Sequence, residues 1–134
     1  MDLQVDIQSL RREDILREKV RAITDEFGMF ENCPLTKALD LVRRKWALQI
    51  VMVLYRSNKP IRFNQLEREL APITQKELTK RLRELEQEGI ISRTIYPEVP
   101  PRVEYQLTES GLAFHLALAG LHEWSHKFYG VAFE

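Results

Sequence analysis

The sequence predicts an α+β domain that is mainly helical, with two strands near residues 90–107. Apolar residues recur every three or four positions through most of the chain, which is the period of an α-helix. After Gly89 the pattern changes to alternation, with Val103, Tyr105 and Leu107 separated by polar residues, as is typical of a strand. With 134 residues, 44% of them apolar, the chain is long enough to form one folded core.

The first helix is expected to end near Gly28. Its apolar residues are spaced four, three and four positions apart: Leu16, Val20, Ile23 and Phe27. Charged residues fill most other positions, so the helix is amphipathic and needs an apolar surface to cover. That surface belongs either to its own domain or to a partner subunit. We treat residues 1–32 as an N-terminal helical extension and residues 33–134 as the domain that follows it.

Three helical segments are predicted between residues 35 and 70. The first two are separated by a break near residues 43–45, and the second, residues 46–55, is apolar on nearly all sides. A helix of this kind is expected at the buried centre of a domain. The third segment is short, and Ala71-Pro72 ends it because proline disfavours helical geometry in the residue before it.

A capped helix and a hairpin come next. Thr74 and Glu77 have the spacing of a capping box, and Gly89 suits the left-handed end of the same helix. The buried stripe of this helix is expected to contain Leu78, Leu82 and Leu85. Two strands around the proline-rich tip at residues 97–101 form the hairpin, and a single last helix runs to near Gly130.

Two helices with a tight connection, followed at once by a hairpin, are the parts of a winged helix-turn-helix, whose second helix enters the major groove of DNA. Although the net charge is zero, residues 43–83 contain eleven basic and three acidic side chains. The second helix is expected to expose side chains that suit base edges and phosphates: Gln75, Lys76, Thr79, Lys80 and Arg83. Such a face either binds DNA or is an ordinary solvated helix surface.

Several motifs, in a fixed order, resemble those of a known family. They are Cys33-Pro34, Lys45-Trp46, RFNQL (62–66), ITQKELT (73–79), LRELE (82–86), GIISR (89–93), YPEVPPRVEY (96–105) and LTESG (107–111). From about Cys33 to Trp124 the chain resembles the HxlR-type transcriptional regulators. The resemblance implies a winged helix-turn-helix with N-terminal and C-terminal dimerisation helices, a homodimer, and sequence-specific binding of operator DNA.

Two features depart from the family pattern. Small residues, often glycines, usually precede the Lys-Trp pair, whereas this chain has Arg43-Arg44. The local turn therefore differs, or an extra phosphate contact is present. The N-terminal extension is also longer than the family norm, and its apolar stripe leads us to place it, as a hypothesis, at the dimer interface.

Within this interpretation, phosphate contacts position the protein and base contacts give specificity. Phosphate contacts are expected from Lys45, Arg62, Lys80 and Arg93. Contacts with the groove floor are expected from Gln75, Lys76 and Thr79, and the DNA-binding set also includes Thr74 and Arg83. Arg102 is expected at the hairpin tip, in or beside the minor groove, whose negative potential attracts arginine.

Cys33 is the single cysteine, so it cannot form an internal disulfide. The resemblance implies oxidant or electrophile sensing at this Cys-Pro position, through an intersubunit or mixed disulfide or another adduct. The alternative is a buried, inert thiol. The expected partners are therefore operator DNA, a second copy of the chain, and a small-molecule or oxidant effector.

The segment HEWSH (122–126) matches the zinc-protease pattern H-E-x-x-H. A catalytic zinc needs a third protein ligand, and no histidine or cysteine follows His126. We therefore interpret the match as a coincidence and expect neither enzyme activity nor a metal or other cofactor. His115 lies seven residues before His122, so a three-histidine metal site is the alternative to solvated histidines on an exposed helix face.

The longest apolar run has six residues, from Ile50 to Tyr55, which is far shorter than a membrane span. A cytoplasmic protein is therefore expected. The competing functional class is a protein–protein interaction module that has a winged-helix fold without specific DNA binding, because a fold does not determine a function.

Overall fold

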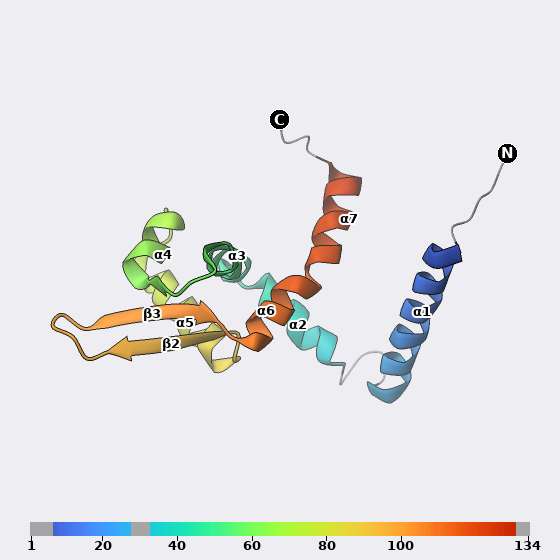
Figure 1. Cartoon of the computed structure of the whole chain (residues 1–134), viewed down its shortest axis with the longest axis horizontal. Helices are drawn as coiled ribbons and strands as arrows, with labels where there is room; N and C mark the ends of the chain where they lie inside the picture. Colours follow the sequence, from blue (N-terminus) through green and yellow to red (C-terminus); the bar gives the residue numbers. More distant parts are fainter. Residues whose placement is uncertain (1–6, 28–32, 131–134) are drawn as a thin grey trace. The chain divides into compact units, whose positions relative to one another are not determined.

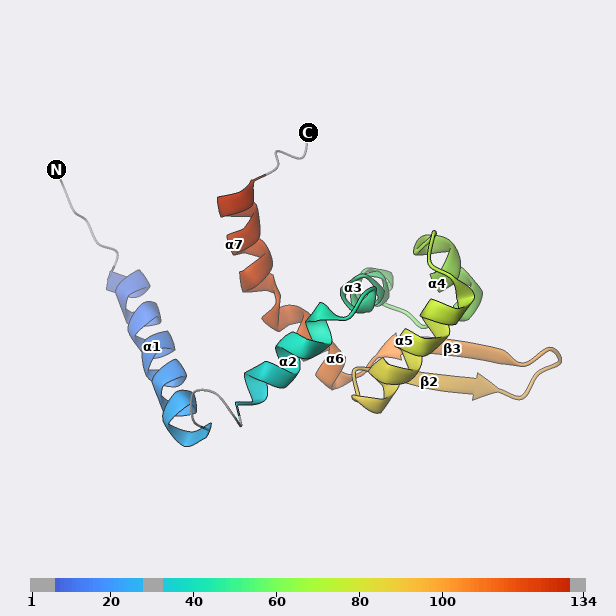
Figure 2. The same cartoon turned by 180° about the vertical axis from the view of Figure 1, so that it is seen from behind.

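A computed structural model describes residues 7–27 and 33–130, and the chain divides into two units, residues 1–43 and 44–134. The first unit contains α1 (Ile7–Phe27) and α2 (Pro34–Arg43). The second unit contains all the remaining helices and strands (Figures 1 and 2). Gly28, where the first helix was expected to end, lies outside the described residues. None of the helices described is both long and apolar enough to cross a membrane.

Helix α3 (Ala47–Ser57) is the first helix of the second unit, and α2 ends at Arg43, so the predicted break near residues 43–45 is confirmed. One side of α3 is buried and contributes four residues to the core: Ala47, Ile50, Val51 and Leu54. This side contacts α4 (Phe63–Glu69), α6 (Glu109–Ala117) and the sheet. The helix therefore lies in the core as expected, although its apolar residues are not all buried, because Tyr55 is 41% exposed.

Helices α4 and α5 (Gln75–Gln87) form the helix-turn-helix. The predicted capping box at the start of α5 is present: the Thr74 hydroxyl accepts a hydrogen bond from Glu77 N, and the Glu77 carboxylate accepts one from Thr74 N. The predicted stripe of Leu78, Leu82 and Leu85 is buried. Gly89 follows the helix with a φ of 75°, the left-handed conformation that glycine adopts most easily.

The predicted hairpin consists of β2 (Ile91–Tyr96) and β3 (Arg102–Leu107). It forms an antiparallel register in which Ile91 faces Leu107 and Tyr96 faces Arg102. A third strand, β1 (Ile61–Arg62), completes a sheet with the order β1-β3-β2 and was not predicted, because two residues are too few to show alternation. The tip of the hairpin projects beyond the helices, as the wing of a winged helix does (Figures 1 and 2).

The C-terminal segment forms two helices, α6 and α7 (Ala119–Tyr129), where one had been expected. They meet at Leu118, which is the C-cap of the first and the N-cap of the second. Helix α6 packs very closely on the start of the wing, because a Cβ added at Gly111 would overlap the carbonyl oxygen of Ile90. Thr108 supports this contact by donating a hydrogen bond from its hydroxyl to Gly89 O while accepting one from Gly111 N.

Candidate nucleic-acid interface

Six of the predicted DNA-binding residues lie together on the outer face of α5 and at its N-cap. Its candidate residues, here called the α5 face, are Thr74, Gln75, Lys76, Thr79, Lys80 and Arg83, and they line one shallow depression. The three buried leucines fix this orientation, since they turn the opposite side of the helix into the core. The Thr79 hydroxyl donates to Gln75 O at 2.7 Å, so its oxygen remains able to accept a hydrogen bond from a ligand.

The cations of the α5 face make no salt bridge within the described residues. Lys76, Lys80 and Arg83 are all exposed and have no carboxylate partner there. Arg62 is also exposed and unpaired within the described chain; it forms the N-cap of α4. These four positive charges are therefore free to meet an external anion at no cost in internal ion pairs.

Lys45, by contrast, is held by a carboxylate. Its Nζ lies 3.3 Å from Glu77 Oε1, and the other carboxylate oxygen accepts the backbone hydrogen bond of Thr74 at 3.0 Å. The hydrogen bond from the Thr74 backbone, aided by Lys45, lowers the pKa of Glu77 from its ordinary value. Glu77 thus both caps α5 and neutralises a candidate phosphate-binding lysine, a role that sequence analysis missed.

The candidate arginines of the wing are also paired. Arg93 Nε lies 3.6 Å from Glu86 Oε2, which links β2 to α5. Beside them, Tyr105 is buried in β3, and this burial raises the pKa of its hydroxyl. Arg93 can therefore contact a phosphate only if its guanidinium binds Glu86 and the phosphate at once, or if its ion pair with Glu86 breaks.

Arg102 does not lie at the tip of the hairpin, contrary to expectation. It is the first residue of β3, and its guanidinium lies 4.0 Å from the centre of the Tyr96 ring. Its nitrogens also lie 3.5 Å from Glu98 and 3.3 Å from Glu104. These three contacts hold the side chain of Arg102 against the base of the tip instead of extending it into solvent.

Arg43 and Arg44, which depart from the family pattern, both form ion pairs within the protein. Arg43 pairs with Asp40 at 2.7 Å, one turn back on α2. Arg44 NH1 lies 3.6 Å from Glu84 Oε2 of α5, and Arg81 binds the same carboxylate. The structure therefore gives Arg44 a role in attaching the turn before α3 to α5, besides the phosphate contact that sequence analysis considered.

Cys33 directly precedes α2 and is partly exposed. Its carbonyl oxygen accepts a hydrogen bond from Thr36 N at 3.0 Å, as expected of a residue at a helix start. The alternative of a fully buried thiol is not what the structure shows. A partly exposed thiol is accessible to oxidants and electrophiles.

The three histidines do not share one helix face, because the break at Leu118 separates α6 from α7. His122 and His126 of α7 have their Nε2 atoms 3.0 Å apart. His115 of α6 instead packs its ring on Tyr55, with ring centres 4.2 Å apart, so the expectation of a solvated histidine is wrong there. Within the described residues, no group of three or more histidine, cysteine, aspartate or glutamate side chains is arranged to hold a metal.

Comparisons with known proteins agree with this architecture. The sequence model of HxlR-like helix-turn-helix proteins matches residues 41–132. The HTH-type transcriptional regulator YdeP of Bacillus subtilis (strain 168) is 39% identical over 99 residues, which cover 74% of this chain and 76% of YdeP.

Solved structures show the same similarity. A transcriptional regulator of the MarR family from Enterococcus faecalis V583 has a TM-score of 0.68 and 38% identity, covering 76% of this chain and 93% of that one. The reduced form of YodB from B. subtilis has a TM-score of 0.66 and 33% identity, covering 74% of this chain and 95% of YodB, and a diamide-treated form of YodB is also similar. These similarities confirm the predicted winged helix-turn-helix.

Proposed function

The chain belongs to the HxlR-like helix-turn-helix family of transcriptional regulators, and from this we propose that it binds operator DNA sequence-specifically as a homodimer. Helix α5 enters the major groove, and the β2–β3 wing lies on the flanking groove or backbone. The protein acts by occupying DNA and has no catalytic role.

The observation that carries this proposal is the state of the cations on the α5 face. Lys76, Lys80 and Arg83 are exposed and unpaired within the described chain, and they project beside Gln75 and Thr79. Amide and hydroxyl groups can read base edges, while the cations bind bases or phosphates. Glu84 also lines this depression, but its carboxylate pairs with Arg44 and Arg81 and not with the cations of the α5 face.

The remaining candidate cations already form ion pairs within the protein. Lys45, Arg93 and Arg102 each have a carboxylate partner at 3.3 to 3.6 Å. On DNA these side chains exchange or share that partner with a phosphate, which reduces the net gain from each contact. We therefore expect Arg62 and Lys80 to supply the larger phosphate contributions.

A homodimer is supported by apolar surface that the single chain leaves uncovered. On α1, the exposed apolar side chains include Ile15, Leu16 and Ile23. On α6 and α7, outside the pocket described below, they include Leu112, Leu121, Trp124 and Phe128. Several large apolar side chains exposed on one helix are typical of an interaction site. A truncated chain without residues 1–28 that remains a tight dimer would count against a role of the extension at the interface.

The proposal is tested by fluorescence anisotropy with the protein's own upstream DNA and an unrelated fragment of equal length. Lys76→Gln should relax sequence preference, at a cost of about 1 to 3 kcal/mol if Lys76 makes a paired base contact. Lys80→Gln should weaken binding to both DNA fragments by the same factor. Lys59→Gln, which removes a lysine outside the α5 face, serves as the control. An unchanged preference in the Lys76 variant would refute its role as a base reader.

The alternative function is a winged-helix module that binds another protein. Salt dependence separates the two, because release of counterions makes DNA affinity fall steeply as salt rises. Absence of DNA binding even at low salt would favour the protein-interaction module.

Redox control through Cys33 is a further part of the proposal. It is supported by the partly exposed thiol and by the similarity to YodB, which has been solved in reduced and diamide-treated forms. Diamide would oxidise two thiols to a disulfide. These are either the Cys33 thiols of the two subunits, or one Cys33 thiol and the thiol of a small molecule. DNA affinity should change after treatment of the native protein and stay constant in Cys33→Ser; a native protein that does not respond to diamide or hydrogen peroxide would exclude this role.

A further inference from the structure

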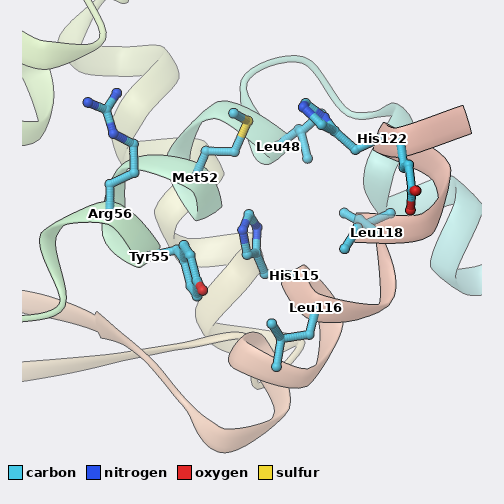
Figure 3. A pocket seen from close by; sticks show the side chains of 10 residues that line it. Leu48, Met52, Tyr55, Arg56, His115, Leu116, Leu118 and His122 are labelled. Carbon is cyan, nitrogen blue, oxygen red and sulfur yellow. The ribbon is translucent and has the colours of Figure 1, made fainter. Parts of the chain in front are cut away.

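A pocket of about 390 Å³ lies between α3 and the junction of α6 with α7 (Figure 3). Its walls are mainly apolar and include Leu48, Met52, Leu116, Leu118 and Ala119. The volume falls in the range of about 300 to 1,000 Å³ that is usual for small-molecule sites. No residue of the pocket belongs to the α5 face, so the two sites are distinct.

The pocket has one positively charged end. Figure 3 shows Arg56 at one end and His122 at the other, with His115 between them. Arg56 makes no salt bridge within the described residues, and a guanidinium beside an apolar wall suits the carboxylate of an apolar molecule. Glu123 also lines the pocket, together with His122, and it disfavours a second negative charge on the same molecule.

A second observation concerns His115. Its ring packs on Tyr55 with ring centres 4.2 Å apart and a tilt of 32°. Its Nδ1 is buried and has no hydrogen-bond partner among the described residues. Buried polar groups are normally paired, and a small rotation of the imidazole would present this nitrogen to a molecule in the pocket.

We propose that this pocket binds a small apolar monocarboxylate. The apolar body lies among Met52, Leu118 and the Tyr55–His115 ring pair, and the carboxylate pairs with Arg56. Because α3 also contacts α4 and β3, the pocket adjoins the helix-turn-helix without being part of it. The binding step itself requires no DNA, so it stands or fails separately from the proposed function.

The test uses the full chain and isothermal titration with 2-naphthoate and, as an uncharged analogue, 2-naphthamide. The native protein should bind naphthoate at least tenfold more tightly than naphthamide. Arg56→Gln should abolish this difference without weakening the amide, and Met52→Trp should fill the pocket and weaken both. Arg68→Gln, which removes an exposed arginine of α4 outside this pocket, is the control and should change neither.

Thermal unfolding and circular dichroism of each variant establish that the fold is kept. Equal affinities for naphthoate and naphthamide would overturn the proposal, since the surface would then be only apolar. Preference for naphthoate that persists in Arg56→Gln would also overturn it. Failure of the native protein to bind either compound would overturn the proposal too. If Met52→Trp then also dissociated a dimer, the occupant of the pocket would be a second copy of the chain.

Discussion

Glu77→Gln should strengthen DNA binding because it releases Lys45 from an internal ion pair. The lysine Nζ lies 3.3 Å from one carboxylate oxygen of Glu77, while the other oxygen accepts the backbone N–H of Thr74 at 3.0 Å. Glutamine can occupy the same place in a capping box. The variant should therefore keep the start of α5 and remove one negative charge from each protomer.

The size of the effect follows from the number of charges released. In a homodimer, two lysines become available to phosphates. Each neutralised phosphate contributes about 0.9 to the slope of log K against log salt, so the slope should steepen by about 1.8. If both proteins bind equally at about 1 M salt, the variant should bind about 60-fold more tightly at about 0.1 M.

The assay is fluorescence anisotropy with one operator fragment over a series of salt concentrations. Glu109→Gln makes the same charge change at the start of α6, which carries none of the DNA-binding candidates, and serves as the control. An unchanged slope in Glu77→Gln would refute the idea that Glu77 restrains Lys45. An equal change in the control would show that only the net charge matters.

Three further predictions concern stability and assembly. Gly111→Ala should lower the free energy of unfolding, measured in urea, by about 1 to 3 kcal/mol, because the added Cβ would clash with Ile90. Gly120→Ala has open space around it and should raise the free energy of unfolding by about 0.5 to 1 kcal/mol. Equal effects of the two substitutions would contradict the close packing of α6. Because the folded state lowers the pKa of Glu77, its stabilisation is present above the ordinary value of 4.5 and is lost as the pH falls through the lowered value, so native and Glu77→Gln proteins should converge in acid denaturation. Trp124→Glu should shift sedimentation from dimer to monomer, and an unchanged dimer would exclude that part of α7 from the interface.

Features that depend on neighbouring residues were the most predictable from the sequence. The capping box of Thr74 and Glu77 and the left-handed Gly89 are present because local backbone geometry determines both. Strand β1 was missed since its two residues gain strand geometry only by pairing with β3. The break at Leu118 was missed as well, because the apolar period continues through it without a proline or other breaker.

The sequence predicted the residue types of the candidate site, but not which of its cations form ion pairs within the protein. The stripe of Leu78, Leu82 and Leu85 determines which side chains of α5 face outward. The sequence contains no signal that Lys45 meets Glu77, 32 positions away, or that Arg44 meets Glu84. Such pairs arise from tertiary packing, and they decide which cations remain available.

These pairs also explain how a chain of zero net charge suits a DNA-binding role. General electrostatic attraction to DNA grows with net positive charge and does not depend on sequence. Here Lys45, Arg93 and Arg102 are balanced by nearby carboxylates, whereas Lys76, Lys80 and Arg83 of the α5 face are unpaired within the described chain. Unpaired positive charge thus remains on the face that we propose to enter the major groove, while no net charge of the whole chain adds a general attraction to DNA. A protein arranged in this way should depend on correct contacts at α5 more than on total charge for its affinity.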